Sequence, residues 1–259
     1  MPQSPHRPFL LVCALTMMVC FPAWALADEV RIAVAANFAN CLQELAPVFQ
    51  EATGHEAVII VGSTGRHHAQ ISAGAPFDVF LAADQHRPEL LVENGLAVAA
   101  SSFTYAEGRL VLWLATAGDT HDQDLKTQLA HRKLARIAMA NPRLAPYGEA
   151  ARQTLENLGL PADLDGRIIL GTSVGQTWQF AATGNTEAAF VALSQVLHSP
   201  PEQVMIVPAE LYDAVKQQAV LLSNAKNKVA GQAFLDFLGG ETARKIIISN
   251  GYLVMGLED

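Results

Sequence analysis

Short apolar runs alternate with longer amphipathic stretches along almost the whole chain. Continuous or alternating hydrophobicity over about four to eight residues predicts strands, and apolar residues spaced three and four apart predict helices. The expected strands span residues 32–36, 57–61, 78–82, 109–115, 136–140, 167–170, 188–192, 204–207 and 219–222. The expected helices span residues 41–51, 66–73, 88–94, 125–131, 149–158, a segment near Trp178, 230–238 and 242–250.

This alternation predicts an α/β fold. Strands that alternate with helices typically form parallel, doubly wound sheets with helices on their faces. The run Ala57–Val61 is apolar throughout, which predicts a strand that is buried on both faces. The chain supplies more strands than one compact sheet uses, so we expect two doubly wound α/β lobes.

The first 27 residues have the pattern of a secretory signal peptide. Arg7 precedes an apolar run that extends to Trp24, and Ala25-Leu26-Ala27 provides the small residues expected before a cleavage site after Ala27. The run is too short for a membrane anchor, and no later stretch reaches the roughly 18 uninterrupted apolar residues of a transmembrane helix. We therefore expect a mature chain of 259 − 27 = 232 residues outside the cytoplasm.

The chain is acidic and poor in charge. It contains 17 Lys and Arg residues and 25 Asp and Glu residues, and its formal net charge is −8, while 51% of residues are hydrophobic. Loss of Arg7 would leave 16 basic residues and a net charge of −9. Such a chain has no basic surface for nucleic acid, and it is too hydrophobic for disorder.

Cysteine usage points to stability from packing alone. Cleavage would remove Cys13 and Cys20 and leave only Cys41, so no intramolecular disulfide is expected. A lipid on Cys20 is a minor alternative, because Met17-Met18-Val19 lacks the small residue expected before a lipidated cysteine.

Four strand-to-helix junctions carry small residues together with hydroxyl or amide side chains. In open α/β sheets, ligands bind where strands end and helices begin. A helix N-terminus presents unpaired N–H groups and partial positive charge, so it can hold an anion without Lys or Arg. Helix capping explains any single junction, but four that converge would form a cage of neutral donors. These junctions are residues 35–40, 61–65, 141–148 and 171–175.

One junction also matches a catalytic motif. Gly171-Thr172-Ser173-Val174-Gly175 has the G-x-S-x-G pattern of a serine hydrolase. The triad needs an acid and then a His downstream, and only Glu187 and His198 are present in that order. The 25 residues after Ser173 leave no room for the strands that normally present them. Serine hydrolase is therefore a distant alternative, and we expect no enzymatic activity.

Four segments carry a family resemblance: Val34–Phe38, Gly62–Gly65, Gly74–Asp84, and Asn141-Pro142 with Ala145–Gly148. Through them the chain resembles the periplasmic molybdate-binding proteins of ABC importers over essentially its whole mature length. The resemblance implies a ligand cleft between two lobes of the type II periplasmic-binding-protein kind, with residues 28–107 plus 209–259 in the first lobe and 108–208 in the second. It implies a monomer in the periplasm that binds molybdate or tungstate, uses no cofactor and delivers its ligand to a membrane permease. Another tetrahedral oxyanion such as sulfate is the alternative ligand.

The resemblance also implies a ligand set. Asn37 and Ser63 stand at family positions that donate to the oxyanion from the first lobe, and Tyr147 and Val174 stand at such positions in the second. Molybdenum would be held only through the oxygens of its oxyanion. A family tyrosine aligns with Ala192, so its phenol is missing here, and the hydroxyl of Tyr147 is the candidate substitute.

Overall fold

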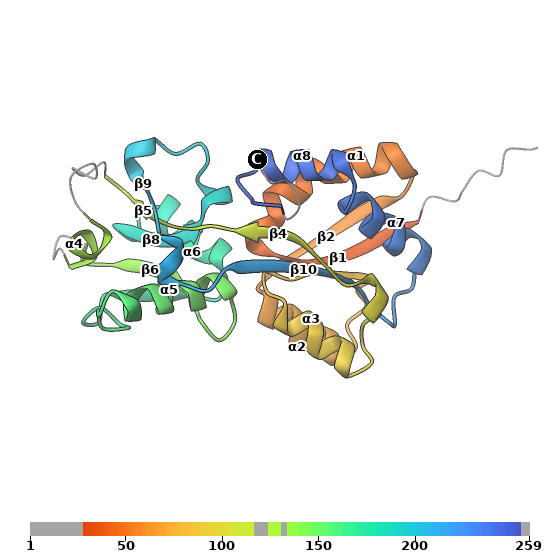
Figure 1. Cartoon of the computed structure of the whole chain (residues 1–259), viewed down its shortest axis with the longest axis horizontal. Helices are drawn as coiled ribbons and strands as arrows, with labels where there is room; N and C mark the ends of the chain where they lie inside the picture. Colours follow the sequence, from red (N-terminus) through yellow and green to blue (C-terminus); the bar gives the residue numbers. More distant parts are fainter. Residues whose placement is uncertain (1–27, 117–123, 131–133, 255–259) are drawn as a thin grey trace, which may run out of the picture.

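The computed structural model describes residues 28–116, 124–130 and 134–254. These residues form two α/β lobes side by side along the long axis of the molecule, each built on a five-stranded sheet (Figure 1). The expected fold class of two α/β lobes is confirmed. The expected signal peptide, residues 1–27, lies outside the described residues.

Lobe I consists of the first sheet and the five helices that cover it. The strand order is β2-β1-β3-β10-β4, with β1 Glu29–Ala35, β2 Glu56–Gly62, β3 Val79–Leu81, β4 Phe103–Gly108 and β10 Val215–Leu221. The helices on one face are α1 Ala39–Thr53, α7 Lys228–Leu238 and α8 Glu241–Ser249, and those on the other are α2 Thr64–Ser72 and α3 His86–Glu93 (Figure 1). A separate cluster of buried apolar side chains fills each side of the sheet.

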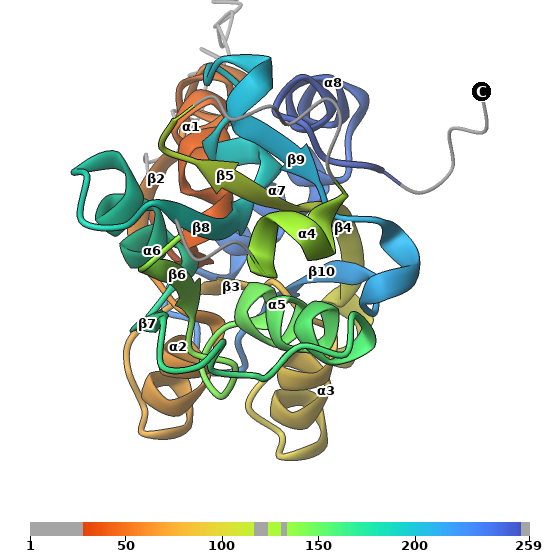
Figure 2. The same ribbon diagram turned by 90° about the vertical axis from the view of Figure 1, so that its left-hand side faces the viewer.

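Lobe II consists of the second sheet and three helices, and it faces the viewer in Figure 2. The strand order is β7-β6-β8-β5-β9, with β5 Leu110–Leu114, β6 Ile137–Ala140, β7 Ile168–Gly171, β8 Ala188–Ala192 and β9 Val204–Ile206. Its helices are α4 Leu125–Ala130, α5 Pro146–Asn157 and α6 Val174–Ala182. Short 3-10 helices complete the two lobes: η1 Ala36–Phe38, η2 Ala99–Ser101, η3 Leu193–Gln195, η4 Pro201–Gln203 and η5 Ala209–Leu211. Within the described ranges, no helix has both the length and the hydropathy needed to span a membrane.

Both sheets are mixed, which corrects the prediction of parallel sheets. Strand β10 is antiparallel to β3 and β4, and β5 is antiparallel to β8 and β9. The chain passes between the lobes beside these strands, because β4 ends at Gly108 and β5 begins at Leu110, and β10 follows β9. A strand that enters a sheet from the other lobe needs no crossover helix on that sheet, so it is not restricted to the parallel direction.

Two strand predictions were inaccurate. Strand β4 was missed, because its sequence Phe-Thr-Tyr-Ala-Glu-Gly mixes polar and apolar residues. Strand β2 was expected to be buried on both faces, but it lies at the edge of its sheet, and Val61 is 49% exposed. A continuous apolar run therefore identified a strand here without fixing its position in the sheet.

Candidate functional site

A small cavity lies between the lobes at the point where four helical segments begin. Its volume is about 10 Å³, which is far less than the roughly 300–1,000 Å³ of a site for a drug-sized ligand. None of the side chains that line it is charged, and the lining includes residues from all four junctions singled out in the sequence. Polar groups reach it from Asn37, Ser63, Thr64, Ser173, Tyr147 and Val174. The fold thus brings together all four residues of the expected ligand set.

Asn37 lies in η1 directly after β1, and it is 2% exposed. Its Nδ2 donates hydrogen bonds to Oε1 of Gln217 (2.8 Å) and to the hydroxyl of Tyr252 (3.2 Å). Its backbone carbonyl accepts hydrogen bonds from the hydroxyls of Tyr252 (2.7 Å) and Ser194 (3.1 Å). The amide oxygen Oδ1 is buried and has no partner among the described residues. A buried acceptor without a partner in a cavity wall requires an explanation.

Ser63 is the N-cap of α2 and is buried. Its Oγ accepts a hydrogen bond from the backbone N–H of Arg66 (3.4 Å). A serine hydroxyl can accept and donate at the same time, so the cap leaves its proton free for a ligand. The neighbouring Thr64 hydroxyl is engaged differently, because it accepts from the backbone N–H of Ala83 (3.0 Å).

His67 packs against the junction that carries Ser63. Its imidazole packs so closely against Gly62 that a Cβ at that position would lie 2.6 Å from the His67 Nε2. The two ring nitrogens lie 3.2 Å from the Val34 carbonyl oxygen and from Oε1 of Gln70. Burial lowers the pKa of the imidazole below its ordinary value, even though both hydrogen bonds act in the opposite direction. The cavity wall beside Ser63 therefore packs against a buried histidine.

Tyr147 and Val174 lie at the starts of α5 and α6. Tyr147 is the second residue of α5, and Val174 is the first residue of α6. The first four N–H groups of a helix have no partner within the helix, so both positions offer backbone donors at the cavity wall. Gly148 allows α5 to begin so close to the sheet, since a Cβ there would overlap the carbonyl oxygen of Ala140.

The phenol of Tyr147 reaches the strands that connect the lobes. Its Oη lies 3.4 Å from Nε2 of Gln217, and a Cβ on Gly108 would overlap the same oxygen. The side chain is buried, and this burial raises the pKa of the hydroxyl well above its ordinary value. The phenol is therefore a neutral hydrogen-bonding group next to the crossover strands.

Hydrogen bonds between the lobes close the cavity. The backbone N–H of Gly65 in lobe I donates to the carbonyl of Leu144 in lobe II (2.9 Å), and Nη2 of Arg87 donates to the carbonyl of Arg143 (2.9 Å). The bond from Ser194 in lobe II to the Asn37 carbonyl is a third link. The structure therefore represents a closed form with the cavity shut between the lobes.

Comparison with known families matches this architecture. The family model of bacterial extracellular solute-binding proteins matches residues 30–253, a range that contains the whole cavity lining and both sheets except Glu29. The chain belongs to this family. Its members bind solutes and are not enzymes, so this solute-binding protein is not an enzyme either.

Individual relatives are similar over nearly their full lengths. The molybdate-binding protein ModA of Rhodobacter capsulatus is 43% identical over 242 residues, which cover 93% of each chain. ModA of Azotobacter vinelandii is 44% identical over 231 residues, which cover 88% of this chain and 91% of the relative. The solved structure of the periplasmic molybdate-binding protein of Azotobacter vinelandii superposes with a TM-score of 0.83 at 38% identity, covering 88% of this chain and 100% of that structure.

The hydrolase interpretation does not hold for this solute-binding protein. Ser173 is the N-cap of α6, and its Oγ accepts a hydrogen bond from the backbone N–H of Gln176 (3.1 Å). In the described part of the chain, no hydrogen bond joins Ser173 to a histidine. The G-x-S-x-G pattern therefore marks the start of a helix and not a nucleophile.

The polar residues that surround Asn37 were not predicted from the sequence. Gln217 lies in β10, Tyr105 in β4, Ser194 in η3 and Tyr252 beyond α8. One signal was available, because Gln217 and Gln218 directly precede the apolar run Ala219–Leu221 of the same strand, and a buried glutamine needs partners. The partners themselves come from segments that are distant in the sequence.

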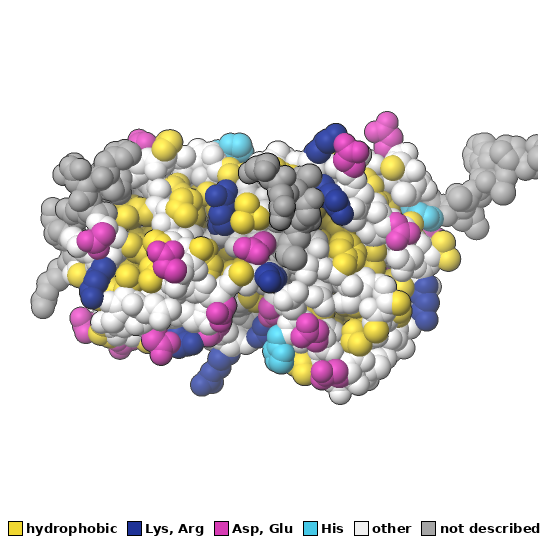
Figure 3. Space-filling view, in the orientation of Figure 1, with side chains coloured by type: hydrophobic (Ala, Val, Ile, Leu, Met, Phe, Trp, Pro, Cys, Tyr) yellow, Lys and Arg dark blue, Asp and Glu magenta, His cyan; other side chains and the backbone are white. Residues whose placement is uncertain are grey.

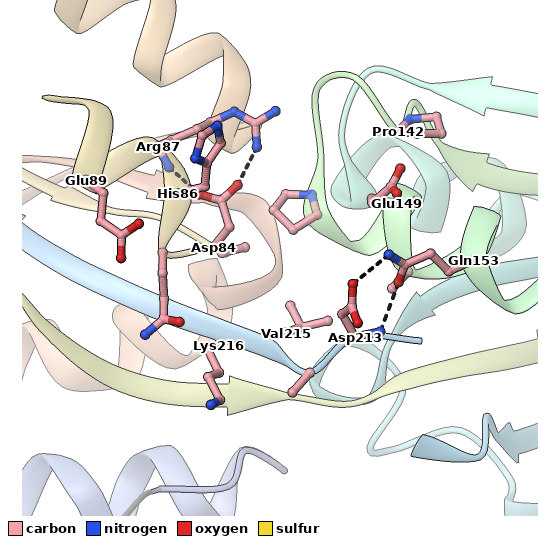
Figure 4. A pocket seen from close by; sticks show the side chains of 15 residues that line it. Asp84, His86, Arg87, Glu89, Pro142, Glu149, Gln153, Asp213, Val215 and Lys216 are labelled. Atoms are coloured by element: carbon pink, nitrogen blue, oxygen red, sulfur yellow. Dashed lines mark hydrogen bonds and ion pairs between the residues drawn. The ribbon is translucent and has the colours of Figure 1, made fainter. Parts of the chain in front are cut away.

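A larger hollow of about 520 Å³ lies between α3, α5 and the start of β10 (Figure 4). Its charged side chains include an ion pair between Arg87 and Asp84, and the amide of Gln153 donates to Asp213 (2.8 Å). Charged side chains of both signs are also scattered over the face shown in Figure 3. Across the described ranges, no three His, Cys, Asp or Glu side chains are arranged to hold a metal ion.

Proposed function

We propose that this protein captures molybdate, or tungstate, in the closed cavity between its lobes. The observation that carries the proposal is the convergence of four helical starts on a small cavity without a charged side chain. Two relatives at 43% and 44% identity are molybdate-binding proteins, which supports molybdate as the ligand.

Four donors hold the oxyanion in this proposal. Asn37 contributes its side-chain amide and Ser63 its hydroxyl from lobe I, and Tyr147 and Val174 contribute backbone N–H groups from lobe II. A hydrogen bond to a charged acceptor contributes about 1.5–3 kcal/mol. Four such bonds give about 6–12 kcal/mol before the costs of closure, which corresponds to dissociation constants from tens of micromolar down to the nanomolar range. Molybdenum is held only through its oxygens, and no cofactor takes part.

The phenol of Tyr147 has a different role from the one expected at the missing tyrosine position. Ala192, which aligns with that tyrosine, is a buried residue at the end of β8. Because the Tyr147 hydroxyl is next to Gln217, we assign the phenol to the link between the lobes and the backbone N–H to the oxyanion.

Neutral donors also provide selectivity by protonation state. A fully deprotonated tetrahedral anion only accepts hydrogen bonds, whereas phosphate near neutral pH retains an O–H that would face another donor. Sulfate shares the acceptor pattern of molybdate and differs from it mainly in size. Direct comparison of the two ions therefore tests the fit of the cavity.

Lobe closure converts binding into a transport signal. We propose that residues 28–107 plus 209–259 and residues 108–208 move as the two lobes, and that the oxyanion stabilises the closed form because only that form brings both donor pairs to it. A membrane permease of an ABC importer then receives the ligand from a monomeric protein. The site of action is the periplasm, reached through a signal peptide, residues 1–27, that is cleaved after Ala27.

A thermal unfolding screen tests this function. The chain from Asp28 onward is heated with molybdate, tungstate, sulfate or phosphate, and a ligand at 100 times its dissociation constant should add about 2.7 kcal/mol of stability. Stabilisation by molybdate and tungstate is expected. If none of the four anions raises the unfolding temperature, the proposal is wrong, and stabilisation by sulfate alone would keep the site and change its ligand.

Asn37→Leu provides the matching binding test. The substitution removes one donor, so the dissociation constant for molybdate should rise about 10-fold or more. Asn94→Leu is the control, because Asn94 is exposed at the end of α3, where its Nδ2 donates to the Leu90 carbonyl. Equal affinities of the two variants would remove Asn37 from the site, and circular dichroism checks that both are folded.

A further inference from the structure

Gln217 is the centre of a buried hydrogen-bond network that joins Asn37 to both lobes. The residue is 0% exposed in β10. Its Oε1 accepts hydrogen bonds from Nδ2 of Asn37 (2.8 Å) and from the hydroxyl of Tyr105 (3.0 Å), and its Nε2 donates to the hydroxyl of Tyr147 (3.4 Å). Asn37 and Tyr105 belong to lobe I, whereas Tyr147 belongs to lobe II. The register of β10 against β4 shifts between Gln217 and Gln218.

The Asn37 side-chain amide is oriented the wrong way for an oxyanion, which needs a hydrogen-bond donor. Nδ2, the donor of the amide, is used by Gln217 and Tyr252, and the atom without a partner is the acceptor Oδ1. A deprotonated oxyanion only accepts, so it gains nothing from an amide oxygen and is repelled by it. Asn37 must therefore present Nδ2 to the cavity when the anion is bound.

The network permits this change at the loss of one hydrogen bond, the one from the Tyr252 hydroxyl to the Asn37 carbonyl. The two ends of a primary amide have nearly the same shape, so Asn37 and Gln217 can both turn over in place. Gln217 Nε2 then donates to Asn37 Oδ1 and to the Tyr105 hydroxyl. Gln217 Oε1 accepts from the Tyr147 hydroxyl.

The hydroxyl groups around the two amides reorient their protons when the amides turn over. The Tyr105 hydroxyl lies 3.3 Å from the carbonyl oxygen of Ala82, and its single proton turns to that oxygen once Gln217 Oε1 has turned away. The Tyr252 proton turns toward Asn37 Oδ1, while Ser194 continues to donate to the Asn37 carbonyl. Burial raises the pKa of the hydroxyls of Tyr105, Tyr147 and Tyr252, so all three keep the protons that the exchange requires.

We propose that Gln217 is a positioning residue for oxyanion binding: its amide sets the orientation of the Asn37 amide, and so decides whether the cavity wall offers a donor or an acceptor. The inference rests on the proposed function, because it assigns Gln217 to the same site. Gln217 also bonds to Tyr147 of lobe II. The orientation of the Asn37 amide therefore depends on whether lobe II is in its closed position. A glutamine is suited to this position because it donates and accepts from one planar group.

A pair of neighbouring glutamines provides the test. Gln217→Met keeps the length of the side chain and removes both hydrogen-bonding atoms. Gln218→Met makes the same change one residue along β10, where the buried Nε2 of Gln218 donates to the hydroxyl of Ser102 (2.6 Å) and not to Asn37. Titration calorimetry with molybdate should show an affinity loss of about 10-fold or more for Gln217→Met and less than about twofold for Gln218→Met, since one charge-assisted hydrogen bond is at stake. Equal losses would overturn the inference.

A double-mutant cycle separates positioning from a general structural effect. In Asn37→Ser the hydroxyl rotates freely to donate to the anion, so it needs no amide to orient it. Gln217→Met should then change the molybdate affinity by less than about twofold in the Asn37→Ser background, against 10-fold or more in the wild-type background. The same loss in both backgrounds would show that Gln217 acts only through stability.

The Asn37 side-chain amide resonances give a direct signature. Assigned by their absence in Asn37→Ser, these ¹⁵N–¹H signals should shift on addition of molybdate to the wild type, and unchanged signals would contradict the exchange. The wild-type titration keeps the two proposals distinct. A wild type that binds no oxyanion rejects the proposed function and the inference with it, whereas a wild type that binds molybdate with an additive cycle rejects the role of Gln217 alone.

Discussion

The two hollows between the lobes differ in size and in chemistry. The closed cavity has a volume of about 10 Å³ and is lined by side chains without charge, whereas the groove beside β10 has a volume of about 520 Å³ and is lined by Asp84, Arg87, Glu89, Glu149, Asp213 and Lys216. Exposed charges are screened by salt and contribute little. Helix N-termini in a closed space act at contact and keep their strength. The smaller and less charged hollow is therefore the better anion site.

The largest effect should come from placing one negative charge in the cavity. Ser63→Asp should raise the dissociation constant for molybdate at least about 1,000-fold, because a buried carboxylate repels the anion and costs several kcal/mol there. Aspartate is as good an N-cap as serine, so α2 should remain capped. Titration calorimetry measures the loss, and thermal unfolding without ligand confirms the fold.

Ser63→Asn is the matched control for this charge. Asparagine has nearly the shape of aspartate, caps a helix as well and can still donate. It should cost far less affinity than aspartate. If the two variants bound molybdate equally, the anion would not be held beside Ser63.

The sequence predicted those features of the site that depend on neighbouring residues. It did not predict the contacts between residues that are far apart in the chain. Each of the four junctions could be predicted because a strand end, small residues and a helix start are adjacent in sequence, as at Gly62–Thr64. The network around Asn37 could not, because Gln217 and Tyr252 are 180 and 215 positions away. The mixed sheets escaped prediction for the same reason, since strand direction depends on which lobe a strand enters from.

The next largest loss of molybdate affinity is expected on substitution of Arg87. Arg87 lies in the groove, but its Nη2 donates to the Arg143 carbonyl across the lobes (2.9 Å), so it stabilises the closed form. Arg87→Ala should weaken molybdate binding by roughly fivefold, the equivalent of one ordinary hydrogen bond. Lys216→Ala removes a positive charge from the same groove, and among the described residues the Lys216 side chain makes no hydrogen bond between the lobes. Titration of both variants should show a change of less than about twofold for Lys216→Ala, and a larger loss there than for Arg87→Ala would favour the groove as the anion site.

A fall in pH should lower the stability of the fold through His67, which packs against the cavity wall. Burial keeps the pKa of His67 below its ordinary value, so the unfolded chain takes up the proton first. The contribution of His67 to stability is therefore full above about pH 6.5 and is lost as the pH falls below that value. Thermal unfolding of the ligand-free protein between about pH 7.5 and pH 5.5 should show a smaller drop in unfolding temperature for His67→Gln than for the wild type. His198→Gln, at an exposed position, should retain the wild-type drop, and identical slopes in all three proteins would exclude His67 as the cause.

The smallest effect should be that of salt on affinity, and its sign distinguishes the two hollows. Raising sodium chloride from about 0.1 M to about 1 M shortens the screening length from roughly 10 Å to 3 Å. An anion held by Arg87 and Lys216 in the groove would lose affinity steeply over this range. In the cavity, contacts with neutral donors are not screened, and the formal net charge of −9 of the chain from Asp28 onward repels the dianion less as salt is added. Calorimetric titrations should therefore give a dissociation constant that changes by less than about twofold, with any residual change toward tighter binding, whereas a steep loss would assign the anion to exposed charges.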